Sequence, residues 1–197
     1  MTLPNQLTVL RIILTPVFVY FFLSEGNYSG EISLAVFLIA ALTDWYDGWL
    51  ARKFNYISAW GKFWDPIADK ILTAGAFLSL VFKGVLIGWP VYIILTRDFL
   101  VTGFRAFAEY KGFTFPTSFY AKLKTLLQMV FLYYVLILYI LRHAKWMEEY
   151  SGIIATMLNQ SVLTILLLAI MIITVHSGAD YFWQERKVLS KLFKADK

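Results

Sequence analysis

The stretch DWYDGWLARKFNYISAWGKFWDPIADK, residues 44–70, carries four aspartates inside an otherwise strongly apolar chain. A carboxylate at membrane depth is costly unless a partner compensates its charge. The aspartates at positions 44, 47, 65 and 69 therefore require a positively charged partner that compensates all four carboxylates.

The composition is that of a polytopic membrane protein. Of the 197 residues, 59% are hydrophobic, 18% aromatic and only 16% charged, and the mean hydropathy is +0.64. A soluble domain is roughly a quarter charged. The length predicts a single domain over residues 1–197. The absence of cysteine excludes disulfides, thiolate metal sites and a cysteine nucleophile.

Apolar segments predict an all-α fold with six transmembrane helices, each needing about 20 residues to span a bilayer. The expected spans lie near residues 7–24, 32–52, 63–83, 85–108, 121–141 and 152–176. The second, third and fourth are long enough only if their charged ends are included.

The basic residues favour a cytosolic N-terminus. With alternating spans, every Lys and Arg except Lys83, Arg142 and Lys145 falls on the inner side. The positive-inside rule thus predicts a multi-pass protein of the cell (inner) membrane, whose aspartates line a polar cavity open to the cytosol. Because the basic residues are spread over several loops, the net charge of +5 indicates topology and an anionic ligand, and we expect no nucleic acid partner.

The aspartates fall on two helical faces, since residues three, four and seven apart share one side of a helix. One face belongs to the second span and the other to the third, and a short turn joins the two helices. The two faces comprise Asp44, Asp47, Gly48 and Ala51, and Gly61, Asp65 and Asp69. Such oxygen donors suit Mg²⁺ or Mn²⁺, which often bridge carboxylates to phosphates. A structural ion-pair network with Arg52, Lys53, Lys62 and Lys70 is the alternative, but it does not require flanking glycines.

The spacing D-x2-D-G-x2-A-R-x8-G-x3-D-x3-D, from Asp44 to Asp69, resembles the signature of the CDP-alcohol phosphatidyltransferases. Further segments resemble the branch of this family that uses glycerol 3-phosphate as acceptor. They are LPNQLTVLRIILTP (3–16), TRDFLVTGFRAFAEYKG (96–112), AKLKTLLQM (121–129) and SGADYF (177–182). The resemblance therefore covers nearly the whole chain.

The resemblance implies an integral membrane enzyme that transfers a phosphatidyl group from CDP-diacylglycerol to sn-glycerol 3-phosphate and releases CMP. It implies two divalent ions, Mg²⁺ or Mn²⁺, held by Asp44, Asp47, Asp65 and Asp69, with Asp69 also the general base. It further implies that CDP-diacylglycerol contacts Asp47, Gly48, Ala51, Arg52 and Gly61. It further implies membrane lipid as a partner, and it is compatible with a homodimer.

The acceptor phosphate needs fixed cations at the same depth. Arg97, Arg105, Lys122 and Lys124 lie at the expected cytosolic ends of the fourth and fifth spans, and we expect them to bind it. The alternative is that they are snorkelling residues of the membrane interface. The same chemistry with inositol phosphate, serine or phosphatidylglycerol as acceptor stays open. An intramembrane prenyltransferase and a divalent-cation transporter fit less well, because the former lacks this glycine-bearing spacing and the latter needs acids in both leaflets.

Overall fold

The computed structural model describes residues 3–54, 59–111, 119–184 and 186 of the chain. This part is helical and contains no strand. Its elements are α1 (Leu3–Leu23), α2 (Ser29–Phe54), α3 (Ala59–Phe82), α4 (Gly88–Tyr110), α5 (Phe119–His143), the 3-10 helix η1 (Lys145–Tyr150), α6 (Ser151–Met157) and α7 (Gln160–Gln184).

The first five long helices lie where the apolar segments predict them, within four residues at each end. The prediction of the sixth, at 152–176, is wrong, because residues 151–157 form the separate helix α6. The side chain of Asn159 explains the break. Its Oδ1 accepts hydrogen bonds from the backbone N–H groups of Ser161 (3.0 Å) and Val162 (3.3 Å), which caps the start of α7.

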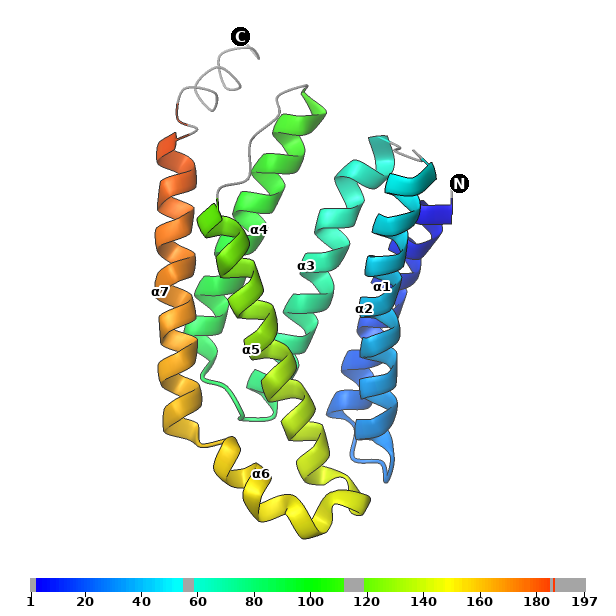
Figure 1. The fold of residues 1–197 in the computed structure, drawn as a ribbon, viewed down its shortest axis with the longest axis vertical. Coiled ribbons are helices and arrows are strands. Elements are labelled where there is room, and N and C mark those ends of the chain that lie inside the picture. Colours follow the sequence, from blue (N-terminus) through cyan, green and yellow to red (C-terminus); the bar gives the residue numbers. More distant parts are fainter. Residues whose placement is uncertain (1–2, 55–58, 112–118, 185, 187–197) are drawn as a thin grey trace.

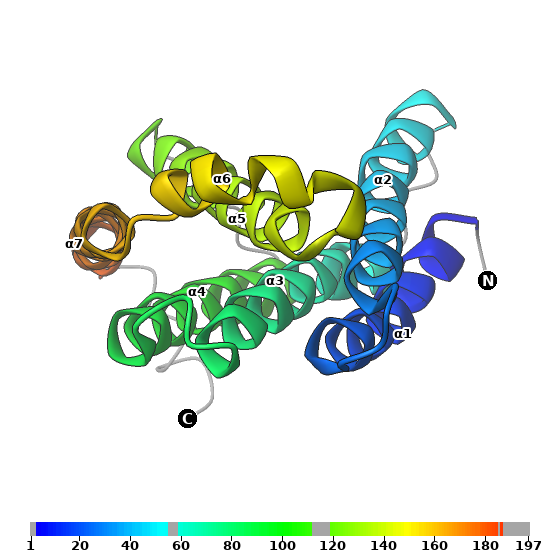
Figure 2. The ribbon, with the colours of Figure 1, turned by 90° about the horizontal axis from the view of Figure 1, so that it is seen from below.

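The six long helices form a closed ring. Following its circumference, α1 packs on α3, α3 on α4, α4 on α7, α7 on α5, α5 on α2, and α2 on α1. Helices α3 and α5 also touch across the ring, and Figure 2 shows this arrangement from one end. The interior of the ring is therefore the place where side chains from distant parts of the sequence meet.

The two ends of the bundle differ. At one end α2 finishes and α3 begins, α4 finishes and α5 begins, and α7 finishes (Figure 1). We call this the aspartate end, because the junction of α2 and α3 contains the stretch 44–70. At the opposite end η1 and α6 run across the bundle from α5 to α7.

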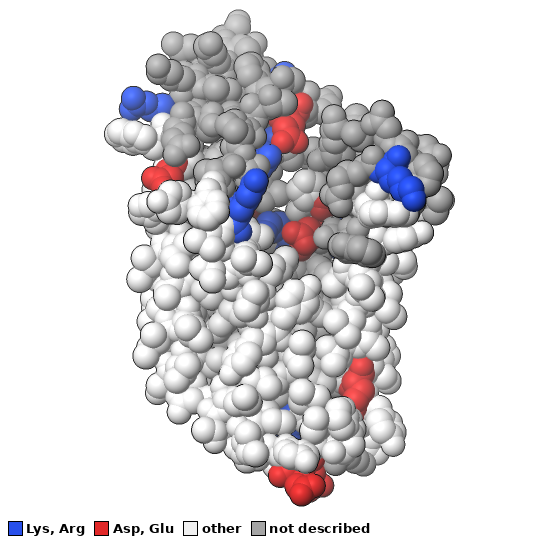
Figure 3. Space-filling view, in the orientation of Figure 1, with Lys and Arg blue, Asp and Glu red and all other residues white. Residues whose placement is uncertain are grey.

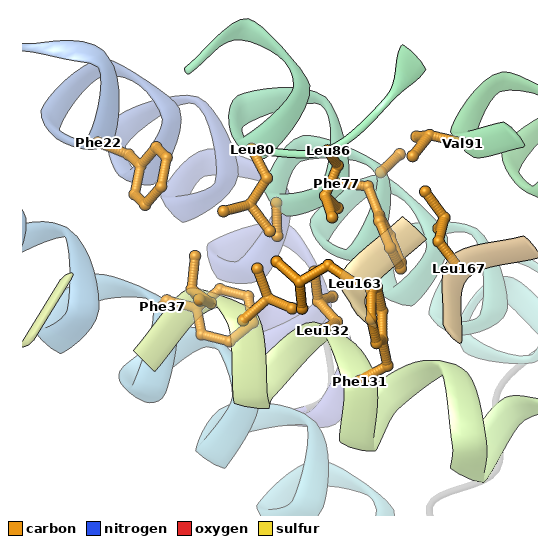
Figure 4. Close-up of a cluster of buried hydrophobic side chains, with 14 of the residues drawn as sticks. Phe22, Phe37, Phe77, Leu80, Leu86, Val91, Phe131, Leu132, Leu163 and Leu167 are labelled. Carbon is orange, nitrogen blue, oxygen red and sulfur yellow. The ribbon is translucent and has the colours of Figure 1, made fainter. Parts of the chain in front are cut away.

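An apolar core fills the middle of the ring and receives side chains from every long helix. Phe37 on α2, Phe77 on α3 and Leu132 on α5 are buried there, with Val91 on α4 and Leu167 on α7. Figure 4 shows how these side chains converge between the helices. Burial of this kind fixes the rotation of each helix, which then decides which polar residues face inward at the aspartate end.

Three helices of the described part are long and apolar enough to cross a membrane: Asn5–Leu23, Phe119–His143 and Gln160–Trp183. The apolar run Ser29–Thr43 in α2 is shorter. This agrees with the sequence, in which the second, third and fourth spans depend on charged ends. The fold is thus all-helical and fits a membrane protein.

Candidate active site

The predicted metal and nucleotide residues lie on α2 and α3 at the aspartate end. Positions 44, 47, 48, 51 and 52 belong to α2, but the side chains there are outside the described residues. The predicted contacts of Asp44, Asp47, Gly48, Ala51 and Arg52 therefore stay predictions. On α3, Gly61 is buried, and Asp65 and Asp69 are partly buried one turn apart.

Asp65 has a partner on α1 that the sequence analysis missed. The hydroxyl of Thr8, which is fully buried, donates a hydrogen bond to Oδ1 of Asp65. A signal was present, because Asn5, Thr8 and Arg11 are polar residues at a spacing of three in an apolar helix, and all three are buried. A hydrogen bond of this kind orients a carboxylate that would ligate a metal.

Helices α1 and α3 can approach closely enough for this contact because of a glycine. A Cβ atom on Gly75 would lie 2.9 Å from Cγ2 of Thr15 and 3.3 Å from Cγ2 of Val19, so no larger residue fits without a shift. The side chain of Thr15 is itself held, since its hydroxyl donates to the carbonyl of Arg11 at 2.9 Å. This contact sets the distance between the two helices.

Asp69 lines a small cavity between α2, α3 and α5. The cavity has a volume of about 60 Å³, and its other walls include Ala41 on α2, Thr73 on α3 and Tyr133 on α5. This is room for a few water-sized groups. Position 44 lies on the same helical face as Ala41, one turn closer to the aspartate end. Asp69 thus borders a space that an attacking hydroxyl could enter.

A second polar cluster lies on the other side of α3, around Asp98 of α4. Asp98 is only 2% exposed, and its Oδ1 accepts a hydrogen bond from the ammonium group of Lys124 on α5, which is 1% exposed. Arg97 Nη1 lies 3.3 Å from the same oxygen, and Lys70 Nζ lies 3.7 Å from Oδ2. One buried carboxylate therefore gathers cations from three helices.

Arg97 also reaches α7. Its Nη2 donates a hydrogen bond of 2.9 Å to the hydroxyl of Ser177. The aliphatic part of Arg97 lies over Gly178, where a Cβ atom would meet Nε at 3.0 Å and Cγ at 3.1 Å. Arg97 is thus clamped between the carboxylate of Asp98 and the surface of α7.

The four residues expected to bind the acceptor phosphate divide into two pairs. Arg97 and Lys124 belong to the Asp98 cluster, and Lys124 is enclosed by protein. Arg105 is more exposed, with Nε 3.2 Å from Oε1 of Glu109 on the same helix, and Lys122 is exposed at the start of α5. The partner of Lys124 could not be read from the sequence, because Asp98 is 26 residues away on another helix.

The donor set at the aspartate end fits a hard divalent cation. Asp65 and Asp69 on one face of α3 could supply oxygen ligands, and the hydrogen bond from Thr8 orients the first of them. Among the residues whose side chains the structure describes, no three His, Cys, Asp or Glu form a cluster. The two carboxylates of α2 that would complete the set are outside that part.

The charged side chains on the molecular surface gather at the two ends of the bundle. Figure 3 shows a nearly uncharged middle band, with basic and acidic side chains around a hollow towards the aspartate end and further charges at the opposite end. A band of this kind suits the hydrocarbon layer of a bilayer.

Comparison with known proteins gives the same family as the aspartate spacing in residues 44–69. The family model described as CDP-alcohol phosphatidyltransferase matches residues 1–183. Three similar proteins bear the name CDP-diacylglycerol–glycerol-3-phosphate 3-phosphatidyltransferase. One, from Rickettsia typhi, is 40% identical over 127 residues, 64% of this chain and 71% of its own length. The protein from Bacillus subtilis is 36% identical over 140 residues, 65% and 72% of the two chains. That from Wigglesworthia glossinidia brevipalpis is 34% identical over 170 residues, 84% and 88% of the two chains. The chain is therefore a transferase that belongs to the CDP-alcohol phosphatidyltransferase family.

Proposed function

We propose that this enzyme transfers the phosphatidyl group of CDP-diacylglycerol to sn-glycerol 3-phosphate, giving phosphatidylglycerophosphate and CMP. The observation that carries the proposal is the position of Asp69, which borders the cavity between α2, α3 and α5 at the end of the bundle that holds the signature stretch. The names of the similar proteins support the choice of both substrates.

The aspartates have separate tasks in this reaction. Asp44, Asp47, Asp65 and Asp69 would hold two Mg²⁺ or Mn²⁺ ions, in a family that generally depends on divalent metals. Bound there, such ions would neutralise the diphosphate. Asp69 takes the proton of the acceptor hydroxyl as its oxygen forms a bond to the phosphatidyl phosphorus. The bond from that phosphorus to the CMP oxygen breaks, and CMP leaves with the electron pair.

The nucleotide and the acceptor would approach from different sides. Asp47, Gly48, Ala51, Arg52 and Gly61 would contact CDP-diacylglycerol, the small residues allowing close approach to the backbone. The partly exposed Arg105 and the exposed Lys122 would meet the acceptor phosphate directly, since charge-assisted contacts to phosphate are strong. Arg97 and Lys124 would act on the same phosphate through the Asp98 cluster, to which both are bound.

We place the reaction at the cytosolic face of the inner membrane, within one domain of residues 1–197. The distribution of basic residues supports the orientation. Six long helices in the described part, three of them clearly apolar, support six spans. The aspartates of the stretch 44–70 would then line a polar cavity open to the cytosol. A homodimer in the membrane is compatible with this arrangement.

Purified enzyme with radiolabelled CDP-diacylglycerol and a panel of acceptors tests the proposal. We expect transfer to glycerol 3-phosphate and little to plain glycerol, which lacks the phosphate. Faster transfer to inositol phosphate, serine or phosphatidylglycerol would keep the family and change the acceptor. EDTA should abolish turnover and added Mg²⁺ or Mn²⁺ should restore it, whereas full turnover in chelator would contradict the metal proposal.

A further inference from the structure

The Asp98 cluster contains three cations, Lys70, Arg97 and Lys124, against the single negative charge of Asp98. Lys124 is nearly inaccessible and by itself neutralises the carboxylate of Asp98. Lys70 and Arg97 lie against the same carboxylate, but their side chains are 14% and 15% exposed. Among the described residues the cluster therefore has two positive charges in excess, both on the side chains that still reach the surface.

Excess charge of this kind calls for an anion. Cations partly withdrawn from water are stable only when counter-charges compensate them. The carboxylate oxygen nearest to Lys70, Oδ2 of Asp98, accepts no hydrogen bond within the described part of the chain, so it acts on Lys70 by charge alone. Asp98 thus holds Lys70 and Arg97 in place. The ammonium group of Lys70 donates no hydrogen bond within the described part of the chain. In Arg97, Nη1 bonds Asp98 and Nη2 bonds Ser177, and each of these nitrogens keeps a second N–H.

The position of Lys70 connects this cluster to the reaction. Lys70 directly follows Asp69, and successive residues of a helix point about 100° apart. Asp69 accordingly borders the cavity shared with α2 and α5, while Lys70 turns towards Asp98 on α4. An anion held at Lys70 and Arg97 would lie on the flank of the residue that takes the acceptor proton.

We propose that Asp98 is a positioning residue of the phosphatidyl-transfer site, whose carboxylate holds Lys70 and Arg97 side by side so that they bind a phosphate group of a substrate. This rests on the proposed function. The phosphate belongs either to the acceptor or to the diphosphate of CDP-diacylglycerol. Separate KM measurements, each with the other substrate saturating, distinguish the two sources.

The decisive variant is the charge-neutral double substitution Asp98→Asn/Lys124→Met. It removes the two fully buried charges together, and the cations that remain, Lys70 and Arg97, are the ones whose side chains still reach the surface, so the fold is preserved. We expect a melting temperature close to that of the wild type and a rise of about tenfold in one of the two KM values. Unchanged KM values for both substrates would overturn the proposal.

Lys124→Met alone is the matched comparison, since it keeps the carboxylate of Asp98. A rise in KM that is larger in the double variant than in Lys124→Met assigns the effect to Asp98. An equal rise in both assigns it to Lys124 and overturns the proposal. If the wild type transfers to no phosphate-bearing acceptor, the proposed function itself fails, and this result is visible before any variant is compared.

Gly178→Ala provides a test without any change of charge. The added methyl group would push the side chain of Arg97 aside by a few tenths of an ångström, since Nε and Cγ lie 3.0 and 3.1 Å from the new atom. The same KM should rise several-fold. Gly103→Ala on α4 is the control, because its Cβ would meet nothing within 4 Å. If the double variant does not fold, equal KM values in Gly178→Ala and Gly103→Ala overturn the proposal.

Discussion

The hydroxyl of Thr8 on α1 donates a hydrogen bond to Oδ1 of Asp65 on α3, although the two residues are 57 positions apart in the chain. Thr8 is fully buried, whereas Asp65 is partly buried. The contact makes the first helix part of the site, because the orientation of Asp65 depends on a residue outside the signature stretch 44–70.

Thr8→Val should weaken metal binding while leaving the fold in place. Valine has nearly the shape of threonine but cannot donate to Asp65. Loss of a hydrogen bond to a metal ligand typically costs about 10–100-fold in metal affinity or activity. We expect the Mg²⁺ concentration for half-maximal activity to rise by about this factor. Thr8→Ser should stay near the wild type, and an unchanged Mg²⁺ titration of Thr8→Val would contradict this role.

Asp69→Asn should separate chemistry from binding. The amide keeps the shape of the side chain beside the cavity but takes no proton. Loss of general-base catalysis should lower kcat by about 10²–10⁴-fold. Binding of CDP-diacylglycerol, measured by calorimetry in detergent, should persist. A rise in KM at normal kcat would assign Asp69 to binding instead.

Arg105→Ala should affect the KM for glycerol 3-phosphate, whereas Lys124→Met should also lower the stability of the fold. Arg105 is partly exposed and forms a salt bridge of 3.2 Å with Glu109 on the same helix, and such pairs contribute little to stability. Its loss should therefore raise the KM for glycerol 3-phosphate by roughly tenfold and leave the melting temperature almost unchanged. Lys124→Met removes the closest partner of Asp98 and a buried charge-assisted hydrogen bond, which typically costs about 1–3 kcal/mol.

Thermal melting in detergent together with steady-state kinetics checks this difference. The expected result is a clear drop in melting temperature for Lys124→Met and none for Arg105→Ala. Equal melting temperatures of the two variants would contradict the prediction that the buried Lys124 stabilises the fold.

Gly75→Ala should destabilise the contact of α1 with α3. The new Cβ would lie 2.9 Å from Cγ2 of Thr15, whose rotation is restrained by its hydrogen bond to Arg11. Overpacking typically costs about 1–3 kcal/mol, and the better helix propensity of alanine returns at most about 1 kcal/mol. The melting temperature should fall relative to Gly103→Ala, where the added methyl group meets open space. A melting temperature equal to that control would contradict the predicted clash.

The sequence by itself determined the helices and the identity of the family. Apolar segments of about 20 residues predicted five of the long helices closely, because hydrophobic length is a local property that each helix carries alone. The sixth was misplaced, since the apolar run continues across Asn159 and does not reveal that this side chain caps a new helix. The spacing from Asp44 to Asp69 was sufficient for the family, because a helical period converts spacing into faces.

Only the tertiary structure decided which faces meet. The contacts of Thr8 with Asp65, of Lys124 with Asp98 and of Arg97 with Ser177 join residues that are 57, 26 and 80 positions apart. Such pairs depend on the rotation and separation of whole helices, which the apolar core and the glycines at 75 and 178 set together. The spacing of residues in the sequence determines which side of its own helix each one occupies. Which residue of another helix it then contacts depends on how the six helices pack into the ring.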